Sequence, residues 1–282
     1  GKFAMIPVME PSSQQEAYEM IFDAFRLSED YKVPVMMRIT TRLAHSRSGI
    51  TRKNGVSQNS LNLPEDPTQF ILLPAFARVR YNELLNMQPS LYEISEASSY
   101  NEYIKGDDHS KGIIACGIGY NYYLENAVKH NLNYPLLKIS HYPVPKSLIS
   151  KLIEENDEIL VIEEGYPFVE EMLRGFFNAP YSIRGRMDHV LPRTGELTPN
   201  DVAKGLGIEQ NQLTEIPAIV QKRPPALCKG CSHADVYHAL NEALEDYGKG
   251  KVFSDIGCYT LGALPPFQAI NTDRKSTRLN SS

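Results

Sequence analysis

Residues 112–119 read Gly-Ile-Ile-Ala-Cys-Gly-Ile-Gly. An apolar run that ends in a glycine turn is typical of a buried strand, and the next residues, about 120–130, predict a helix. Further strands are expected at 136–139 and 158–162, with helices at about 146–156 and 167–174. Short strands that alternate with helices predict a parallel sheet covered on both faces, so we expect an α/β protein.

Residues 13–40 predict the same helix and strand repeat. Ser13-Gln14-Gln15-Glu16 has the pattern of a capping box. Apolar side chains then recur at helical spacing and predict a helix to about Tyr31 that buries one face: Ala17, Met20, Ile21, Ala24 and Phe25. Strands are expected at residues 3–8 and 33–40, and the polar residues 46–67 predict a linker.

The C-terminal part is predicted to bring three cysteines together. Cys228 and Cys231 precede a helix expected at 234–247, whose apolar face is marked by Val236, Leu240, Ala243, Leu244 and Tyr247. That helix is about 21 Å long, and a strand of six or seven residues from about residue 252 covers a similar distance back. Cys258 should therefore lie at the carboxyl edge of the sheet, beside the other two.

Three thiolates at one sheet edge have more than one possible role. They could hold three corners of an iron–sulfur cluster or bind zinc. Alternatively, residues 228–231 are a reactive or structural CxxC, and Cys258 is an unrelated buried residue. His233 and His238 could complete a Cys2His2 zinc site, but both fall at the start of the helix; His233 is favoured to face the site, and His238 to be an ordinary helix residue.

Composition excludes several functional classes. The 282 residues are 42% hydrophobic and carry a net charge of -5, which argues against nucleic acid or an anionic membrane as the main partner. No stretch approaches the roughly 18 apolar residues that would span a bilayer, and the N-terminus does not resemble a signal peptide. Four cysteines without an export signal predict a cytoplasmic protein with metal or redox chemistry.

Other polar residues near strand ends are weaker candidates. Arg38, Arg42 and His45 could bind a substrate carboxylate, with salt bridges between domains as the alternative. Cys116 with the glycines that follow could cradle a phosphate, although a tight strand-to-helix turn is favoured because a third glycine is absent. The neighbours Glu163 and Glu164 resemble an acid pair, of which one is expected to face solvent.

Packing is the expected role of the aromatic residues on the helix that follows the glycine turn. These are Tyr120, Tyr122 and Tyr123.

Four stretches resemble the large subunit of the indolepyruvate ferredoxin oxidoreductase family, which is thiamine-diphosphate-dependent. They are residues 38–46 (RITTRLAHS), 195–199 (GELTP), 223–233 (RPPALCKGCSH) and 254–266 (SDIGCYTLGALPP). They occur in the family's domain order, and the resemblance covers residues 3–272. Lys229 and Ser232 stand where the family usually has proline, and neither change removes a thiol.

The resemblance implies a multi-domain, parallel-sheet thiamine-diphosphate enzyme architecture with incomplete first and last domains. Residues 1–60 would end a pyrimidine-binding-type domain, and residues 61–190 would form a transketolase C-terminal-like α/β domain. A linker at 191–225 would lead to the start of the thiamine-diphosphate-binding domain at 226–272. Residues 273–282 resemble the translation of a sequencing-library adapter and are interpreted as an artefact tail.

The reaction implied is oxidative decarboxylation of arylpyruvates such as indolepyruvate to aryl-acetyl-CoA, with reduction of ferredoxin. The implied cofactors are thiamine diphosphate, Mg2+ and a 4Fe-4S cluster, and the implied partners are a small (beta) subunit, ferredoxin, coenzyme A and the arylpyruvate. The resemblance implies cofactor contacts for Ile256, Gly257, Cys258, Tyr259 and His233. It implies metal contacts for Cys228, Cys231 and Cys258.

Two alternatives to this function remain open. One is a ferredoxin oxidoreductase for another 2-oxoacid, of the branched-chain or phenylglyoxylate type; the other is a zinc-stabilised α/β binding module without catalysis. The family's activating glutamate is expected upstream of Gly1, and its Mg2+ motif downstream of Thr272. The 282-residue chain alone is therefore expected to be inactive.

Overall fold

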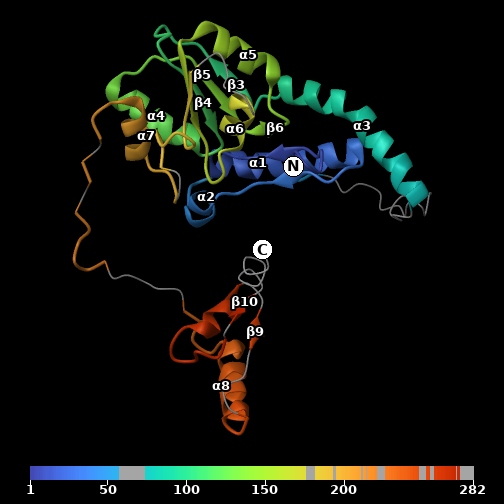
Figure 1. The fold of residues 1–282 in the computed structure, drawn as a ribbon, viewed down its shortest axis with the longest axis vertical. Helices are drawn as coiled ribbons and strands as arrows, with labels where there is room; N and C mark the ends of the chain where they lie inside the picture. Colours follow the sequence, from blue (N-terminus) through green and yellow to red (C-terminus); the bar gives the residue numbers. More distant parts are fainter. Residues whose placement is uncertain are drawn as a thin grey trace. The chain divides into compact units, whose positions relative to one another are not determined.

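A computed structural model describes residues 1–56, 74–175, 182–192, 195–210, 212–213, 215–220, 226–247, 252–254, 257–270 and 272–273. The chain divides into two compact units, residues 1–212 and 213–282 (Figure 1). No helix in the described part of the chain is long and apolar enough to cross a membrane.

A five-stranded sheet forms the centre of the first unit. Strands β4 and β7 lie inside it and pair in parallel with their neighbours, and β3 pairs antiparallel at one edge. In sheet order the strands are β3 (Glu102–Ile104), β5 (Leu136–Ile139), β4 (Gly112–Cys116), β7 (Glu158–Ile162) and β8 (Ser182–Arg184). The predicted α/β class is confirmed.

Helices cover both faces of this sheet because its central strands are apolar on both sides (Figure 1). Ile113 and Ala115 of β4 point into one core, and Ile114 and Cys116 point into the other. Helices α4 (Gly119–His130) and α7 (Pro199–Leu206) pack on the first face, and α5 (Lys146–Glu155) and α6 (Phe168–Arg174) on the second.

A small second sheet is joined directly to the first. Its order is β2 (Met36–Met37), β1 (Val8–Met9) and β6 (His141–Tyr142), with β1 parallel to β2 and antiparallel to β6. Strand β6 follows β5 after a single buried residue, Ser140. The amide oxygen of Asn101 accepts hydrogen bonds from the backbone N–H groups of Ser140 and His141. These two backbone donors, where the chain passes from one sheet to the other, therefore have a hydrogen-bond partner within the protein.

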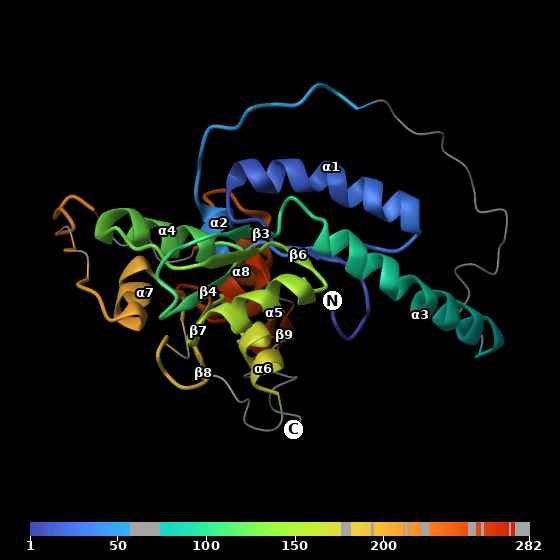
Figure 2. The ribbon, with the colours of Figure 1, turned by 90° about the horizontal axis from the view of Figure 1, so that it is seen from above.

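Helices α1 (Gln14–Tyr31), α2 (Thr41–His45) and α3 (Pro74–Glu96) accompany the small sheet. Both ribbon views show α1 and α3 extending from it, away from α4 and α7 (Figures 1 and 2). The hydroxyl of Ser13 accepts from the backbone N–H of Glu16, as the sequence predicts. The Glu16 carboxylate, however, accepts from the backbone N–H of Ser12 rather than that of the N-cap residue.

The predicted buried face of α1 is partly wrong. Met20, Ala24 and Leu27 are buried against Met9, whereas Phe25 is 68% exposed and Ile21 is 43% exposed. The buried residues follow i, i+4 and i+7 spacing, and each exposed residue comes one position, about 100°, after a buried one.

Two elements are not predicted from the sequence, and two strands are shorter than predicted. The strands expected at 3–8 and 33–40 are reduced to the two-residue strands β1 and β2. Helix α3 is not predicted, and it contains Pro89, a residue that usually interrupts helices. Strand β8 is also missed, because Ile183 is its only buried residue and gives no apolar run.

The second unit is built around α8 (Ser232–Glu245), the two-residue parallel strands β9 (Phe253–Ser254) and β10 (Thr272–Asp273), and the 3-10 helix η2 (Cys258–Ala263). Tyr237 of α8 packs with Ala269 and Ile270. The predicted apolar face of α8 is therefore wrong in part: Val236 is 60% exposed and Tyr247 is 86% exposed. Among the described residues of this unit, the buried apolar side chains are Tyr237, Ala269 and Ile270.

Parts of several predictions lie outside the described residues. They are residues 57–67 of the expected linker, residues 223–225 and 255–256 of the family-like motifs, and residues 274–282 of the tail that resembles an adapter. The domain boundaries near residues 60, 190 and 225 stay predictions.

Replacing Gly117 by alanine is expected to destabilise the first unit by about 2 kcal/mol or more. Gly117 has φ +51°, and an added Cβ would lie 2.6 Å from Cγ of Glu10. Gly207 has φ +73° with no atom within 4 Å of such a Cβ, so Gly207→Ala tests the backbone effect alone and should cost about 1 kcal/mol. Urea unfolding measures both, and equal losses would contradict the close approach.

Candidate functional site

The CxxC segment forms the N-terminal end of α8. Cys231 is the N-cap residue, and its backbone N–H donates to the carbonyl of Cys228 at 3.0 Å. Gly230, between them, has φ +75°, a conformation that glycine adopts without a steric penalty. Cys228 is exposed and Cys231 is half-buried, so both thiols are accessible.

One ring contact and one hydrogen bond hold the Cys258 turn against the start of α8. The rings of His233 and Tyr259 meet edge to face at 4.5 Å between centroids, and the hydroxyl of Tyr237 donates to the carbonyl of Tyr259 at 2.7 Å. His233 Nδ1 also lies 3.3 Å from Sγ of Cys231. These contacts bring Cys231, His233 and Tyr259 into one corner of the second unit.

Tyr237 interacts electrostatically with residues on both sides of this corner. Burial raises the pKa of Tyr237 most, a hydrogen bond with Ser254 lowers it, and the interactions with Tyr259, Cys231 and Cys258 raise it further. Cys258 itself is exposed at the start of η2. Gly257 before it has φ +117°, and Ile256 lies outside the described residues.

The described residues, which include all three cysteines, contain no group of three or more His, Cys, Asp or Glu side chains that could hold a metal ion. His238 packs on the ring of Phe267 at 4.9 Å between centroids. The metal role of Cys228, Cys231 and Cys258 and the cofactor role of Gly257, Tyr259 and His233 therefore stay predictions.

Polar residues of the first unit gather where parallel strands end. Glu10 follows β1, Arg38 follows β2, Cys116 ends β4 and Glu163 follows β7. The carboxyl ends of parallel strands are the usual position of ligand sites in α/β proteins.

The carboxylate of Glu10 joins several of these strand ends. It forms an ion pair with Arg38 and accepts a hydrogen bond from the hydroxyl of Tyr142 at 3.0 Å. Arg38 also donates to the backbone carbonyl of Glu164 at 2.8 Å. Burial raises the pKa of Glu10 although Arg38 lowers it, and burial raises the pKa of the neighbouring Cys116 thiol well above its usual range. An unreactive, fully buried Cys116 fits the tight-turn interpretation.

The expectation that Glu163 or Glu164 faces solvent is wrong, because both side chains are buried. Glu163 accepts from the backbone N–H groups of Val169 and Glu170, each at 2.9 Å, and so caps the start of α6. Glu164 accepts from the Tyr122 hydroxyl and the Leu197 N–H, each at 3.1 Å. Desolvation by burial raises the pKa of Glu163 to about 7.

The predicted carboxylate-binding residues do not share one environment. Arg38 is engaged as described above, and Arg42 lies 3.4 Å from Glu196 and 5.5 Å above the ring of Tyr122. His45 is exposed at the end of α2. The two arginines make contacts within the first unit, and their role toward a substrate stays a prediction.

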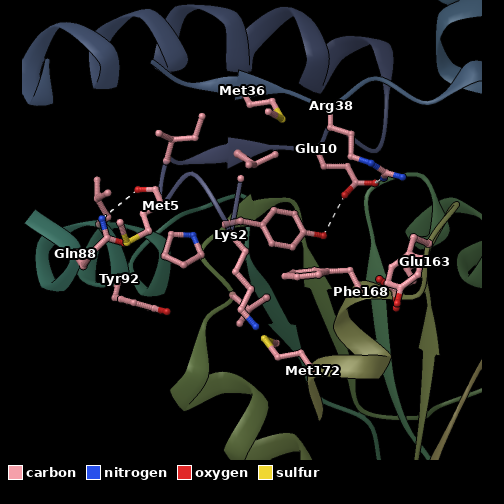
Figure 3. A pocket seen from close by; sticks show the side chains of 18 of the residues that line it. Lys2, Met5, Glu10, Met36, Arg38, Gln88, Tyr92, Glu163, Phe168 and Met172 are labelled. Atoms are coloured by element: carbon pink, nitrogen blue, oxygen red, sulfur yellow. Dashed lines mark hydrogen bonds and ion pairs between the residues drawn. The ribbon is translucent and has the colours of Figure 1, made fainter. Parts of the chain in front are cut away.

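A cavity of about 560 Å³ opens beside Glu10 (Figure 3). Its polar end carries Glu10, Arg38, Tyr142, Glu163 and Glu164. Its walls are mostly apolar and come from β1, β2, α3, α6 and the first residues of the chain. Arg38, Glu163 and Glu164 are candidates from the sequence analysis, whereas Glu10 and Tyr142 are not. The position of Glu10 directly after an apolar pair is the one signal in the sequence that points to it.

The first unit is thus an α/β protein with polar residues gathered at the carboxyl edge of parallel strands. No protein-family model matches the chain. It is similar to indolepyruvate oxidoreductase subunit IorA from Methanothermobacter thermautotrophicus (33% identical), Archaeoglobus fulgidus (35%) and Pyrococcus horikoshii (34%). These matches cover 95–96% of this chain and 45–46% of each relative, so the chain spans about half the length of the curated relatives it matches.

Along nearly its whole length, the chain thus resembles one part of indolepyruvate oxidoreductase subunit IorA. A solved 2-oxoglutarate:ferredoxin oxidoreductase from Magnetococcus marinus is 14% identical with a TM-score of 0.48; the match covers 71% of this chain and 41% of that one.

The raised pKa of Glu163 predicts a pH-dependent stability. Its carboxyl titrates at about 7 when folded and near 4.5 in its ordinary state, so between these values the folded chain binds more protons than the unfolded chain. Its contribution to stability should therefore fall, by on the order of 3 kcal/mol, as the pH rises from 4.5 through 7.

The free energy of unfolding of Glu163→Gln, measured in urea at pH 5 and 8, should lack this fall. Burial lowers the pKa of His141 to about 4, and this shift makes stability rise with pH, which is the opposite effect. The pH dependence of the variant is therefore compared with that of the unsubstituted chain. Glu154→Gln removes an exposed carboxylate and is the matched control. An unchanged pH slope in Glu163→Gln would contradict the buried, protonated state.

Thiol reactivity should separate Cys116 from the other cysteines. Cys116 is 1% exposed with a raised pKa, whereas Cys228 and Cys258 are exposed and Cys231 is half-buried. We expect an aromatic disulfide reagent to titrate three thiols in the native chain and the fourth only after denaturation, with no fourth thiol in Cys116→Ala. Four rapidly reacting native thiols would contradict the burial of Cys116.

Proposed function

We propose that this chain is part of the large subunit of an oxidoreductase that decarboxylates arylpyruvates such as indolepyruvate oxidatively. The products would be aryl-acetyl-CoA and reduced ferredoxin. The observation that carries the proposal is the 32–35% identity to IorA proteins along about 95% of the chain. The relatives' name also favours this function over a zinc-stabilised binding module.

Thiamine diphosphate with Mg2+ is the proposed cofactor, and it would supply the carbanion for attack on a 2-keto carbon. Gly257, Cys258, Tyr259 and His233 are proposed to border it, together with Ile256. Support comes from the corner in which His233 packs against Tyr259 and lies beside Cys231. In that corner, α8 presents its N-terminal end, where unpaired N–H groups favour anions such as a diphosphate.

A 4Fe-4S cluster on Cys228, Cys231 and Cys258 is also proposed, from the resemblance alone. The chemistry of three thiolates suits iron or zinc. The arrangement of the three thiols in the structure does not fit a metal site, because within the described residues they form no group that could hold a metal ion. No electron-transfer step is therefore assigned to these residues.

Proposed partners are a small (beta) subunit, ferredoxin, coenzyme A and the arylpyruvate, in the cytoplasm. Binding of the substrate carboxylate by Arg38 or Arg42 would require each arginine to exchange a contact with Glu10 or Glu196. His45 is exposed and would need no such exchange. Another 2-oxoacid, branched-chain or phenylglyoxylate-type, is the alternative substrate.

The complete subunit that carries this sequence, combined with its partner subunit, should reduce ferredoxin or methyl viologen when indolepyruvate and coenzyme A are supplied. The 282-residue chain alone should not. An anaerobic preparation of the complete protein should show the visible absorption of iron–sulfur centres; a colourless, zinc-containing preparation would support the binding module. Dye reduction by the isolated chain, or activity confined to another class of 2-oxoacid, would contradict the proposal.

A further inference from the structure

We propose that the cavity between β1, α3 and α6 binds an aromatic primary amine, with the protonated amino group at its carboxylate end. This site lies wholly within the first unit and does not depend on the proposed function. Figure 3 shows the cavity, with Glu10 and Glu163 toward one end and Gln88, Met5 and Tyr92 toward the other.

The walls of the cavity fit an apolar, ring-containing body. Apolar side chains reach it from separate elements: Met5, Met36, Leu91, Tyr92, Phe168 and Met172. Methionine and aromatic side chains adapt well to the face of a ring. A volume of about 560 Å³ lies within the range of small-molecule sites.

The polar end carries more negative than positive groups. Glu10, Glu163 and Glu164 line the cavity together with the cations Arg38 and Lys2. Arg38 is already held by the Glu10 carboxylate and the Glu164 carbonyl, and Glu164 lies 3.7 Å from Arg186. Glu163 forms no ion pair with any described side chain and is held only by two backbone N–H groups. The Glu163 carboxylate therefore has no cationic partner among the described side chains, and a bound ammonium group would supply one.

One ammonium group already lies at the cavity. Nζ of Lys2 lies 5.6 Å from the centroid of the Phe168 ring, a cation–π distance. Phe168 is adjacent to Val169, whose N–H binds Glu163. The ring and the carboxylate thus offer two kinds of contact to an ammonium group, and Lys2 is an exposed, competing occupant.

The protonation of Glu163 should be coupled to binding. At its pKa of about 7 half of the carboxyls are neutral, and an ammonium ligand favours the ionised form. Several titratable or charged groups surround Glu163: Glu10 after β1, Arg38 after β2, Cys116 on β4, Tyr142 on β6, Glu170 on α6 and Arg186 after β8. Of these, Glu10 and Glu170 raise its pKa further.

Calorimetric titration of the 282-residue chain tests the site with three probes that share a phenylethyl body and differ in their polar group: 2-phenylethylamine, 2-phenylethanol and 3-phenylpropionate. We expect the amine to bind roughly tenfold or more tightly than the alcohol, because a charged hydrogen bond replaces a neutral one. Its affinity should rise about tenfold from pH 6 to pH 8 as Glu163 ionises. Circular dichroism verifies folding at each pH.

Two variants give opposite predictions. Glu163→Gln should weaken amine binding roughly tenfold and remove its pH dependence, while Glu154→Gln, on the exposed side of α5, should change neither. Lys2→Ala, at an exposed residue, should strengthen amine binding because it removes the competing ammonium group. Tighter binding of 3-phenylpropionate than of the amine, or weaker amine binding in Lys2→Ala, would overturn the proposal, as would the absence of amine binding.

Discussion

The buried carboxylate of Glu10 is the constraint on which the first unit depends. Its side chain is 3% exposed, and it binds Arg38 after β2 and Tyr142 on β6. Burial of a charge is costly unless hydrogen bonds and an opposite charge compensate it, so these strands must keep their relative positions. Arg38 extends the constraint to the end of β7 through the carbonyl of Glu164.

The same constraint explains the glycine that follows β4. The chain must turn from β4 into α4 where the Glu10 side chain lies, and Gly117 provides both the left-handed conformation and the space. The neighbouring Cys116 is consequently sealed from solvent, and burial beside carboxylates keeps it in the thiol form. The glycine turn in the sequence therefore meets a packing requirement.

The two units differ in how firmly their chemistry is defined. In the first, each carboxylate at the sheet edge has donors of its own, and only Glu163 lacks a cationic partner among the described residues. In the second, a ring contact and a hydrogen bond order the corner around Cys231, but the cysteines form no metal-binding group with the other residues that the structure describes. The likeness to IorA proteins therefore rests on sequence similarity, and the cofactors remain proposed.

The sequence by itself determined the central strands, the helices between them and the cap of α1, because these depend on neighbouring residues and on apolar runs buried on both faces. It also contained the motifs that define the family. Only the tertiary structure decided that Glu163 and Glu164 are both buried, that Phe25 and Val236 are exposed, and that α3 and β8 exist. The physical reason is that partners distant in sequence settle these features: an adjacent acid pair can be buried only where donors such as Tyr122, Leu197 and the start of α6 converge on it.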